Sequence, residues 1–151
     1  MPRSNNQLIE SVREIRLASR TLVRELGFLN KHLAGTELSP PQVHALLELE
    51  RFPTTQASDL QRLFRLNKSA VSRLLTDLQR RGFITRVASE IDARGRILRL
   101  TKQGRQQLAV IHKKADRQFT AALQTINEQE HPVLVKSLQA FAQALSSTRH
   151  S

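Results

Sequence analysis

The sequence predicts a mainly α-helical fold that contains one two-stranded β-hairpin. Apolar residues recur at spacings of three and four through most of the chain, and two short β-prone runs interrupt this pattern after its midpoint. The longest helical patterns lie at the two ends. The 151 residues are enough for one domain or for two small interlocked ones.

The first predicted helix lies near the N-terminus and has a single apolar face. Positions on that face recur every three or four residues, at Leu8, Val12, Ile15, Ser19, Leu22 and Leu26. Gly27 is a plausible end of this helix, and residues 28–37 are predicted to be irregular, with Gly35 as a breaker.

The next helices have clear start signals. Ser39 can cap a helix whose first positions are prolines, because their missing N–H groups cost little there. This helix extends to Pro53, after which Thr54 and Thr55 offer another cap. The short helix that follows has a predicted buried face of Ala57, Leu60, Leu63 and Phe64.

A further helix is predicted from Asn67, a favourable N-cap, to Gly82, a left-handed C-cap. Its apolar stripe consists of Val71, Leu74, Leu75 and Leu78. Residues 83–87 and 96–100 are the β-prone runs, and turn residues lie between them. They are therefore predicted to form a hairpin.

Thr101 is predicted to cap a long helical region, which Pro132 divides from a last helix. The apolar positions of these two helices are Leu108, Ile111, Ala115, Phe119, Ala122, Leu123 and Ile126, and then Leu134, Leu138, Phe141 and Leu145. We expect residues 1–37 and 103–151 to form a helical dimerisation region. Residues 38–102 are expected to form a winged helix-turn-helix, with the hairpin as the wing.

The charge distribution points to an anionic partner that docks on the middle third. Of the formal net charge of +11, residues 54–102 carry +7. No apolar run approaches the length of a membrane span, so we expect no membrane partner. There is no cysteine, and the five histidines lack paired ligand spacing, so neither a metal site nor a cofactor is predicted. No phosphate loop or catalytic constellation indicates an enzyme.

Two helices around a tight turn, followed by a basic hairpin, suit the reading of double-stranded DNA. The second helix presents small and basic side chains that can enter a major groove and bond to bases or phosphates. A guanidinium at the hairpin tip can enter a minor groove. The candidate DNA-binding residues are Thr55, Gln56, Asn67, Lys68, Ser69, Ser72, Arg73, Thr76, Asp92, Arg94 and Arg96.

The stretch from Leu38 to Gly104 resembles the MarR family of bacterial winged-helix regulators. The similar segments are LSPPQVHALLEL, TTQASDLQRLFRLNKSAVSRLLTDLQRRGFITR and DARGRILRLTKQG. The resemblance implies an obligate homodimer that binds a pseudo-palindromic operator, usually as a repressor. It also implies that Arg94 is the minor-groove arginine and Asp92 its partner. Arg65 departs from the family, which often has a small residue at this position.

The resemblance further implies a small-molecule effector, such as an aromatic acid, for which Arg16, Arg20 and His44 could form a carboxylate pocket. A structural role for His44 is the alternative. The stretch GFLNKHLAGTEL is similar to MarR domains fused to acetyltransferases, although we expect a stand-alone regulator. A sequence-tolerant architectural DNA-binding protein is the other alternative. The expected location is the cytoplasm, in association with the bacterial nucleoid.

Overall fold

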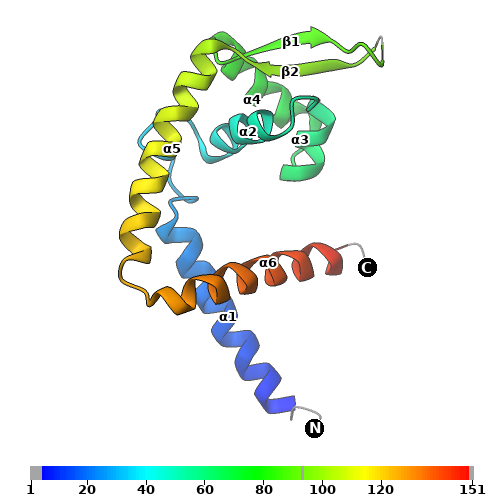
Figure 1. The fold of residues 1–151 in the computed structure, drawn as a ribbon. Helices are drawn as coiled ribbons and strands as arrows, with labels where there is room; N and C mark the ends of the chain where they lie inside the picture. The colour runs from blue at the N-terminus through cyan, green and yellow to red at the C-terminus, as the bar shows by residue number, and fades with distance from the viewer. Residues whose placement is uncertain (1–4, 93, 150–151) are drawn as a thin grey trace. The chain divides into compact units, whose positions relative to one another are not determined.

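The computed structural model describes residues 5–92 and 94–149 and is mainly helical, with one two-stranded sheet (Figure 1). Its elements are α1 (Asn5–Glu25), α2 (Pro40–Arg51), α3 (Ala57–Phe64), α4 (Lys68–Arg80), β1 (Ile84–Ala88), β2 (Arg96–Leu100), α5 (Lys102–Leu123), the 3₁₀-helix η1 (Glu128–Glu130) and α6 (His131–Thr148). The chain divides into two compact units, one up to Ile111 and one from His112 onward. The predicted fold class is confirmed.

The core of the first unit lies among α2, α3, α4 and the hairpin. Helix α2 packs against α4 and β2, α3 packs against α4 and β2, and α4 also contacts β1. The strands are antiparallel, with Ile84 opposite Leu100 and Ala88 opposite Arg96. The buried side chains that form the core are Leu38, Val43, Ala45, Leu46, Leu49, Leu60, Val71, Leu75, Leu78, Ile84, Leu98, Leu108 and Ile111.

Local signals set several helix ends where the sequence predicts them. The Asn67 side chain accepts a hydrogen bond of 2.8 Å from the Ala70 N–H, so it caps α4. Gly82 has φ +79° and ends the helix, while the Phe83 N–H donates to the Leu78 carbonyl at 3.0 Å. This pattern is a Schellman motif, which satisfies carbonyls that the last turn leaves free.

Two predicted boundaries and one predicted core residue are wrong. Helix α3 is capped at Gln56, because the preceding backbone is extended alongside β2: the Leu98 N–H donates to the Thr55 carbonyl at 2.9 Å. Strand β1 begins at Ile84, because the Phe83 N–H is used in the Schellman motif that follows α4. Leu63 is 53% exposed, since it lies on the rim of an open pocket.

The start of α5 lies tightly against the end of α4. The Thr101 hydroxyl donates to the Gly82 carbonyl and accepts from the Gly104 N–H at 3.0 Å, so Thr101 caps α5 as predicted. A Cβ atom at position 104 would lie only 2.1 Å from the Phe83 carbonyl oxygen. Only glycine fits this approach, which fixes where α5 leaves the hairpin.

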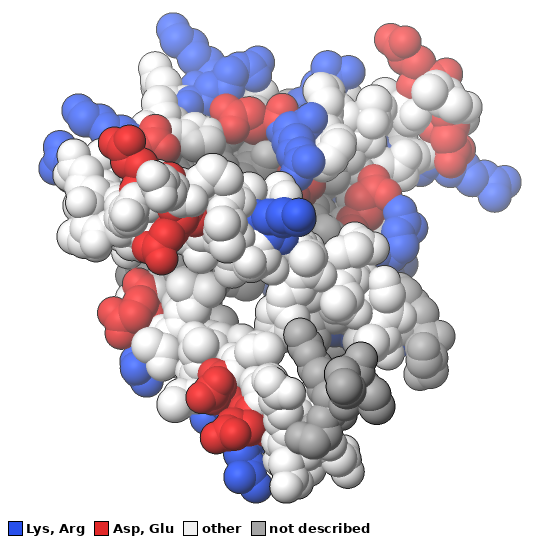
Figure 2. All heavy atoms as spheres, turned by 60° about the horizontal axis from the view of Figure 1, so that its bottom comes forward, with Lys and Arg blue, Asp and Glu red and all other residues white. Residues whose placement is uncertain are grey.

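Helices α1 and α6 have no buried residues. Their exposed large apolar side chains are Leu8, Ile9, Val12, Ile15, Leu17, Leu22 and Val23 on α1, and Val133, Leu134, Val135, Leu138, Phe141 and Leu145 on α6. Figure 2 shows broad uncharged areas between the basic and acidic side chains on the face that it displays. Each terminal helix therefore exposes several large apolar side chains and buries none of its residues.

Candidate nucleic-acid interface

Helix α4 separates an apolar face from a polar one. Val71, Leu75 and Leu78 are buried in the core. The opposite face consists of exposed residues that the sequence singles out: Lys68, Ser69, Ser72, Arg73 and Thr76. Because this face starts at the capped N-terminus of α4, its donors and the helix dipole both favour an anionic partner.

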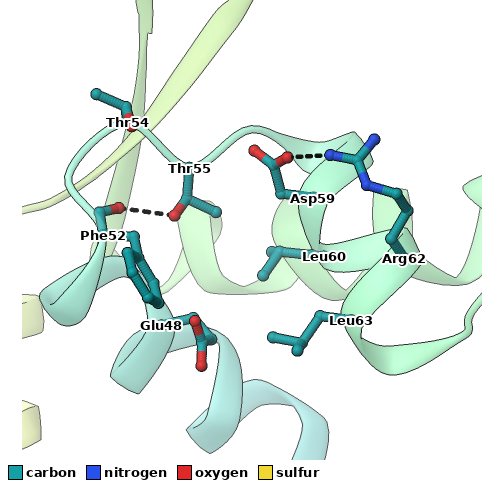
Figure 3. Close-up of a pocket in the computed structure, with 8 residues that line it drawn as sticks. All are labelled: Glu48, Phe52, Thr54, Thr55, Asp59, Leu60, Arg62 and Leu63. Atoms are coloured by element: carbon teal, nitrogen blue, oxygen red, sulfur yellow. Dashed lines mark hydrogen bonds and ion pairs between the residues drawn. The ribbon is translucent and has the colours of Figure 1, made fainter. Parts of the chain in front are cut away.

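Thr55 and Gln56 precede α3 and have different surroundings. Thr55 is buried, and its hydroxyl donates to the Phe52 carbonyl at 2.6 Å (Figure 3). Gln56 is half-buried, and its backbone pairs with Ile97 of β2. Its amide nitrogen lies 3.2 Å from the point where a Cβ on Gly95 would be. Gln56 therefore lies at the base of the wing, whereas Thr55 holds the loop between α2 and α3.

The wing tip is ordered by short-range hydrogen bonds. The Ser89 hydroxyl accepts from the N–H groups of Ile91 and Asp92, each at 3.2 Å. The Asp92 carboxylate accepts from the Arg94 N–H at 3.0 Å, and the Asp92 carbonyl accepts from the Gly95 N–H at 2.9 Å. Asp92 thus holds the backbone of Arg94. The side chains of Arg94 and Arg96 are exposed.

Asp77 on the last turns of α4 joins three side chains and is not among the predicted site residues. Its carboxylate accepts from Arg80, from Arg81 at 2.8 Å and from the amide of Gln42 at 2.6 Å. The hydrogen bond from Arg80, followed by those from Gln42 and Arg81, lowers the pKa of Asp77 to about 2. The spacing of Asp77 from Arg80 and Arg81 is a readable helical ion-pair signal. Nothing local signals the bond to Gln42.

A shallow hollow of about 240 Å³ lies on the exposed face of α4. It is lined by Ser72, Arg73, Thr76, Asp77 and Arg80. Four of these side chains can donate hydrogen bonds, and the carboxylate of the fifth is already engaged by Arg80. The hollow therefore presents donors to an anion or to acceptor groups on base edges.

His44 packs in an aromatic environment on α2. Its ring stacks on Phe28, with centroids 5.2 Å apart, and burial lowers its pKa despite the opposing effect of Glu48. A pocket of about 300 Å³ adjoins it, lined by Phe28, Pro40, Pro41, His44, Phe64 and Leu66. Arg16 and Arg20 are exposed on α1 and do not line this pocket. Their predicted role beside His44 stays a prediction.

A second pocket, of about 500 Å³, lies between the end of α2 and α3 (Figure 3). Phe52 and Glu48 face Leu60 and Leu63 across it, and Arg62 forms an ion pair with Asp59 at its edge. Within residues 5–92 and 94–149, no group of three His, Cys, Asp or Glu residues is placed to hold a metal ion. No helix in that part of the chain is long and apolar enough to cross a membrane.

The middle of the chain is similar to a known protein family. Residues 36–95 match the model of the MarR family. The uncharacterized HTH-type transcriptional regulator YdgJ of Bacillus subtilis (strain 168) is 29% identical over 108 residues, which are 72% of this chain and 66% of that protein. This chain thus spans about two thirds of the length of YdgJ.

Two solved structures share the fold. FabT of Streptococcus pneumoniae, in complex with DNA, matches with a TM-score of 0.68 and 24% identity over 95% of this chain and 98% of that chain. The PcaV transcriptional regulator of Streptomyces coelicolor, in complex with its natural ligand, matches with a TM-score of 0.67 and 23% identity over 85% and 91%. The match to FabT covers 95% of this chain, so it extends well beyond the hairpin and its neighbouring helices.

Proposed function

Because residues 36–95 match the model of the MarR family, we propose that the chain is a DNA-binding transcriptional regulator of that family and acts as a homodimeric repressor on a pseudo-palindromic operator. Each subunit places α4 in a major groove and the wing tip in the adjacent minor groove. The family consists of regulators and not of enzymes, which agrees with a surface built of donors rather than of a catalytic constellation.

The observation that carries this proposal is the polar face of α4. It is exposed over its whole length, while the opposite face anchors the helix in the core. An anchored helix can hold its side chains in a fixed register against base edges. FabT, which has the same fold, was solved in complex with DNA, and this supports DNA as the partner. In this assignment Ser72 and Arg73 read bases, Lys68 and Ser69 bind near phosphates, and Arg94 enters the minor groove.

The homodimer rests on the apolar faces of α1 and α6. Large exposed apolar surfaces on a soluble domain indicate an interface, and a two-fold dimer would cover the same faces on both subunits. We therefore assign residues 1–37 and 103–151 to dimerisation and residues 38–102 to DNA binding. Two recognition helices related by two-fold symmetry explain why the operator is expected to be a pseudo-palindrome.

Selection of bound sites from a random pool of duplex DNA tests the proposal. The expected result is one enriched pseudo-palindrome, which the protein binds at least about a thousandfold more tightly than random duplex at the same salt concentration. A sequence-tolerant architectural protein would enrich no site and would show only a steep salt dependence. That outcome would overturn the repressor assignment.

An aromatic acid is the effector that the site supports best. The His44 pocket offers aromatic and proline surfaces against which a planar ring can pack. Arg16 and Arg20 do not line this pocket in the single chain, and their binding of the effector's carboxylate is a separate proposal that the Arg16→Ala variant tests. A thermal-shift screen of aromatic carboxylates tests this: a stabilising compound should lose its effect in His44→Ala and in Arg16→Ala. Stabilisation that persists in both variants would place the effector elsewhere.

A further inference from the structure

The last turns of α4 contain an acidic residue on a helix that is otherwise suited to bind a polyanion. Asp77 adjoins the hollow that Ser72, Arg73 and Thr76 also line. A carboxylate near a phosphate backbone is repelled, so by itself Asp77 opposes DNA binding. Its presence on this face therefore indicates a second role, which offsets the repulsion.

The hydrogen bonds of Asp77 indicate that it holds neighbouring side chains in position. Both carboxylate oxygens are occupied: Oδ1 accepts from Arg80, while Oδ2 accepts from Arg81 and Gln42. The Arg80 side chain remains 76% exposed, so only one edge of its guanidinium is used by the pair. A guanidinium carries five N–H donors, so the remaining donors of Arg80 are free to face outward.

Gln42 connects this pair to the core. Its side chain is buried, donates to Asp77 at 2.6 Å, and accepts from the Ser39 N–H at 3.0 Å at the start of α2. The Asp77 carboxylate is therefore fixed from behind by a buried amide that is itself held by the cap of α2. A long arginine side chain normally loses rotamer freedom when it binds, and this arrangement reduces that cost for Arg80.

We propose that Asp77 is a positioning residue for DNA binding, which holds Arg80 beside the α4 hollow as a clamp for a backbone phosphate. The chain from Ser39 through Gln42 to Asp77 orients the guanidinium before DNA arrives. Arg80 lies in the last turn of α4, about two helical turns beyond Arg73. Its contact with a phosphate would fix the helix in the groove without selecting sequence. This inference rests on the proposed function, because it assumes that α4 enters a major groove.

The sign of one substitution separates this proposal from simple electrostatics. Asp77→Asn removes a negative charge from the DNA-binding face, so charge alone predicts tighter binding. Loss of the clamp predicts the reverse, a roughly tenfold loss of affinity for operator and random duplex alike. Glu90→Gln is the matched control: Glu90 is an exposed acid on the wing, and its removal should leave affinity unchanged or raised.

A salt series distinguishes positioning from loss of folded protein. Asp77→Asn and Arg80→Ala should each reduce the slope of log affinity against log salt by about one, and the double variant should be no worse than either single one. Asp77→Glu, which can still reach Arg80, should recover part of the affinity. A destabilised but otherwise competent protein would lose affinity with an unchanged slope, and circular dichroism checks the fold directly.

These experiments distinguish failure of the Asp77 clamp from failure of the proposed repressor function. If Asp77→Asn binds as tightly as the wild type or more tightly, Asp77 does not position Arg80, and the clamp is overturned while the repressor assignment stands. If wild-type protein selects no operator, the repressor assignment fails first. A tenfold loss with a reduced slope, shared by Arg80→Ala, supports the clamp.

Discussion

Gly104 is a residue whose identity is set by a single approach of two backbone segments. A Cβ at this position would meet the Phe83 carbonyl oxygen at 2.1 Å, well inside van der Waals contact. Gly104→Ala should therefore lower the free energy of unfolding by about 1–3 kcal/mol, although alanine favours helix formation. Urea unfolding measures the change. Gly95→Ala is the control, because its nearest neighbour is a flexible glutamine side chain at 3.2 Å. Equal stability of the two variants would contradict the packing argument.

Arg94 is exposed at the wing tip, and its backbone is held by Asp92. Arg94→Ala should weaken operator binding by about 1–3 kcal/mol per half-site contact, because a guanidinium is lost from the minor groove. The thermal midpoint should change little, since the residue packs against nothing in the core. Fluorescence anisotropy at fixed salt measures the affinity. An unchanged dissociation constant would remove the wing tip from the interface.

Asp77 should also make stability depend on pH. Its ordinary pKa of 3.8 falls to about 2 in the folded protein, chiefly through the hydrogen bond from Arg80. A lowered folded-state pKa stabilises the fold above the unfolded value, and this contribution disappears as pH falls through the folded value. The stability difference between wild type and Asp77→Asn should therefore be constant above about pH 5 and shrink between pH 4 and 2. Urea unfolding at a series of pH values tests this, and a difference that stays constant down to pH 2 would contradict it.

At the scale of the element, α4 combines two kinds of contact that substitution can separate. Arg73 lies nearly two turns from the Asn67 cap, on the face opposite Val71. Arg73→Ala should relax preference at particular base pairs by about 1–3 kcal/mol. Arg99, on β2, lies outside that face and is assigned to phosphate, so Arg99→Ala should weaken every duplex equally.

Binding measurements on one operator, its single-base variants and random duplex distinguish the two effects. The slope against salt should fall by about one for Arg99→Ala, because one phosphate contact is lost. If Arg73→Ala lowers the affinity for all duplexes alike, Arg73 contacts phosphate, and the recognition face lies elsewhere on α4.

Most elements could be predicted from the sequence because their signals are local. Periodicity of three and four places Lys68 through Thr76 on one exposed face, and Asn67 and Gly82 act on their immediate neighbours. The start of α3 could not be placed in this way. It depends on the pairing of residues 55 and 56 with β2, some 40 residues further along the chain.

In the candidate site, too, local sequence patterns could be predicted, whereas contacts between residues far apart in the sequence could not. Basic and hydroxyl side chains on a helix face, and an arginine in a turn, are legible in the sequence. The clamp on Arg80 is not, because Gln42 reaches Asp77 across 35 residues through tertiary packing. The exposure of Leu63 also follows from packing, since an eight-residue helix does not show which edge an adjacent element leaves open.

At the scale of the whole molecule, charge and apolar surface are distributed over different parts of the chain. The net charge of +7 lies within residues 54–102, which include α3, α4 and the wing. Among the 18 residues of helix α6, Lys136 is the one Lys, Arg, Asp or Glu residue. The charge of the basic segment favours an anionic partner, whereas a nearly uncharged helix with exposed leucines favours an apolar one.

The dimer prediction follows from these exposed faces. Light scattering should give a mass of about twice 17.2 kDa at micromolar concentration. Leu138 is 47% exposed on α6, so Leu138→Glu should cost the isolated chain little but should place a charge in the interface and shift the mass toward 17.2 kDa. Leu29→Glu is the matched control, because Leu29 is 75% exposed in the irregular segment after α1 and should leave the mass unchanged. Leu138→Glu should also lose operator affinity, since two linked half-sites bind more tightly than one. A wild-type mass of 17.2 kDa, or an unchanged mass for Leu138→Glu, would show that these faces are not the interface.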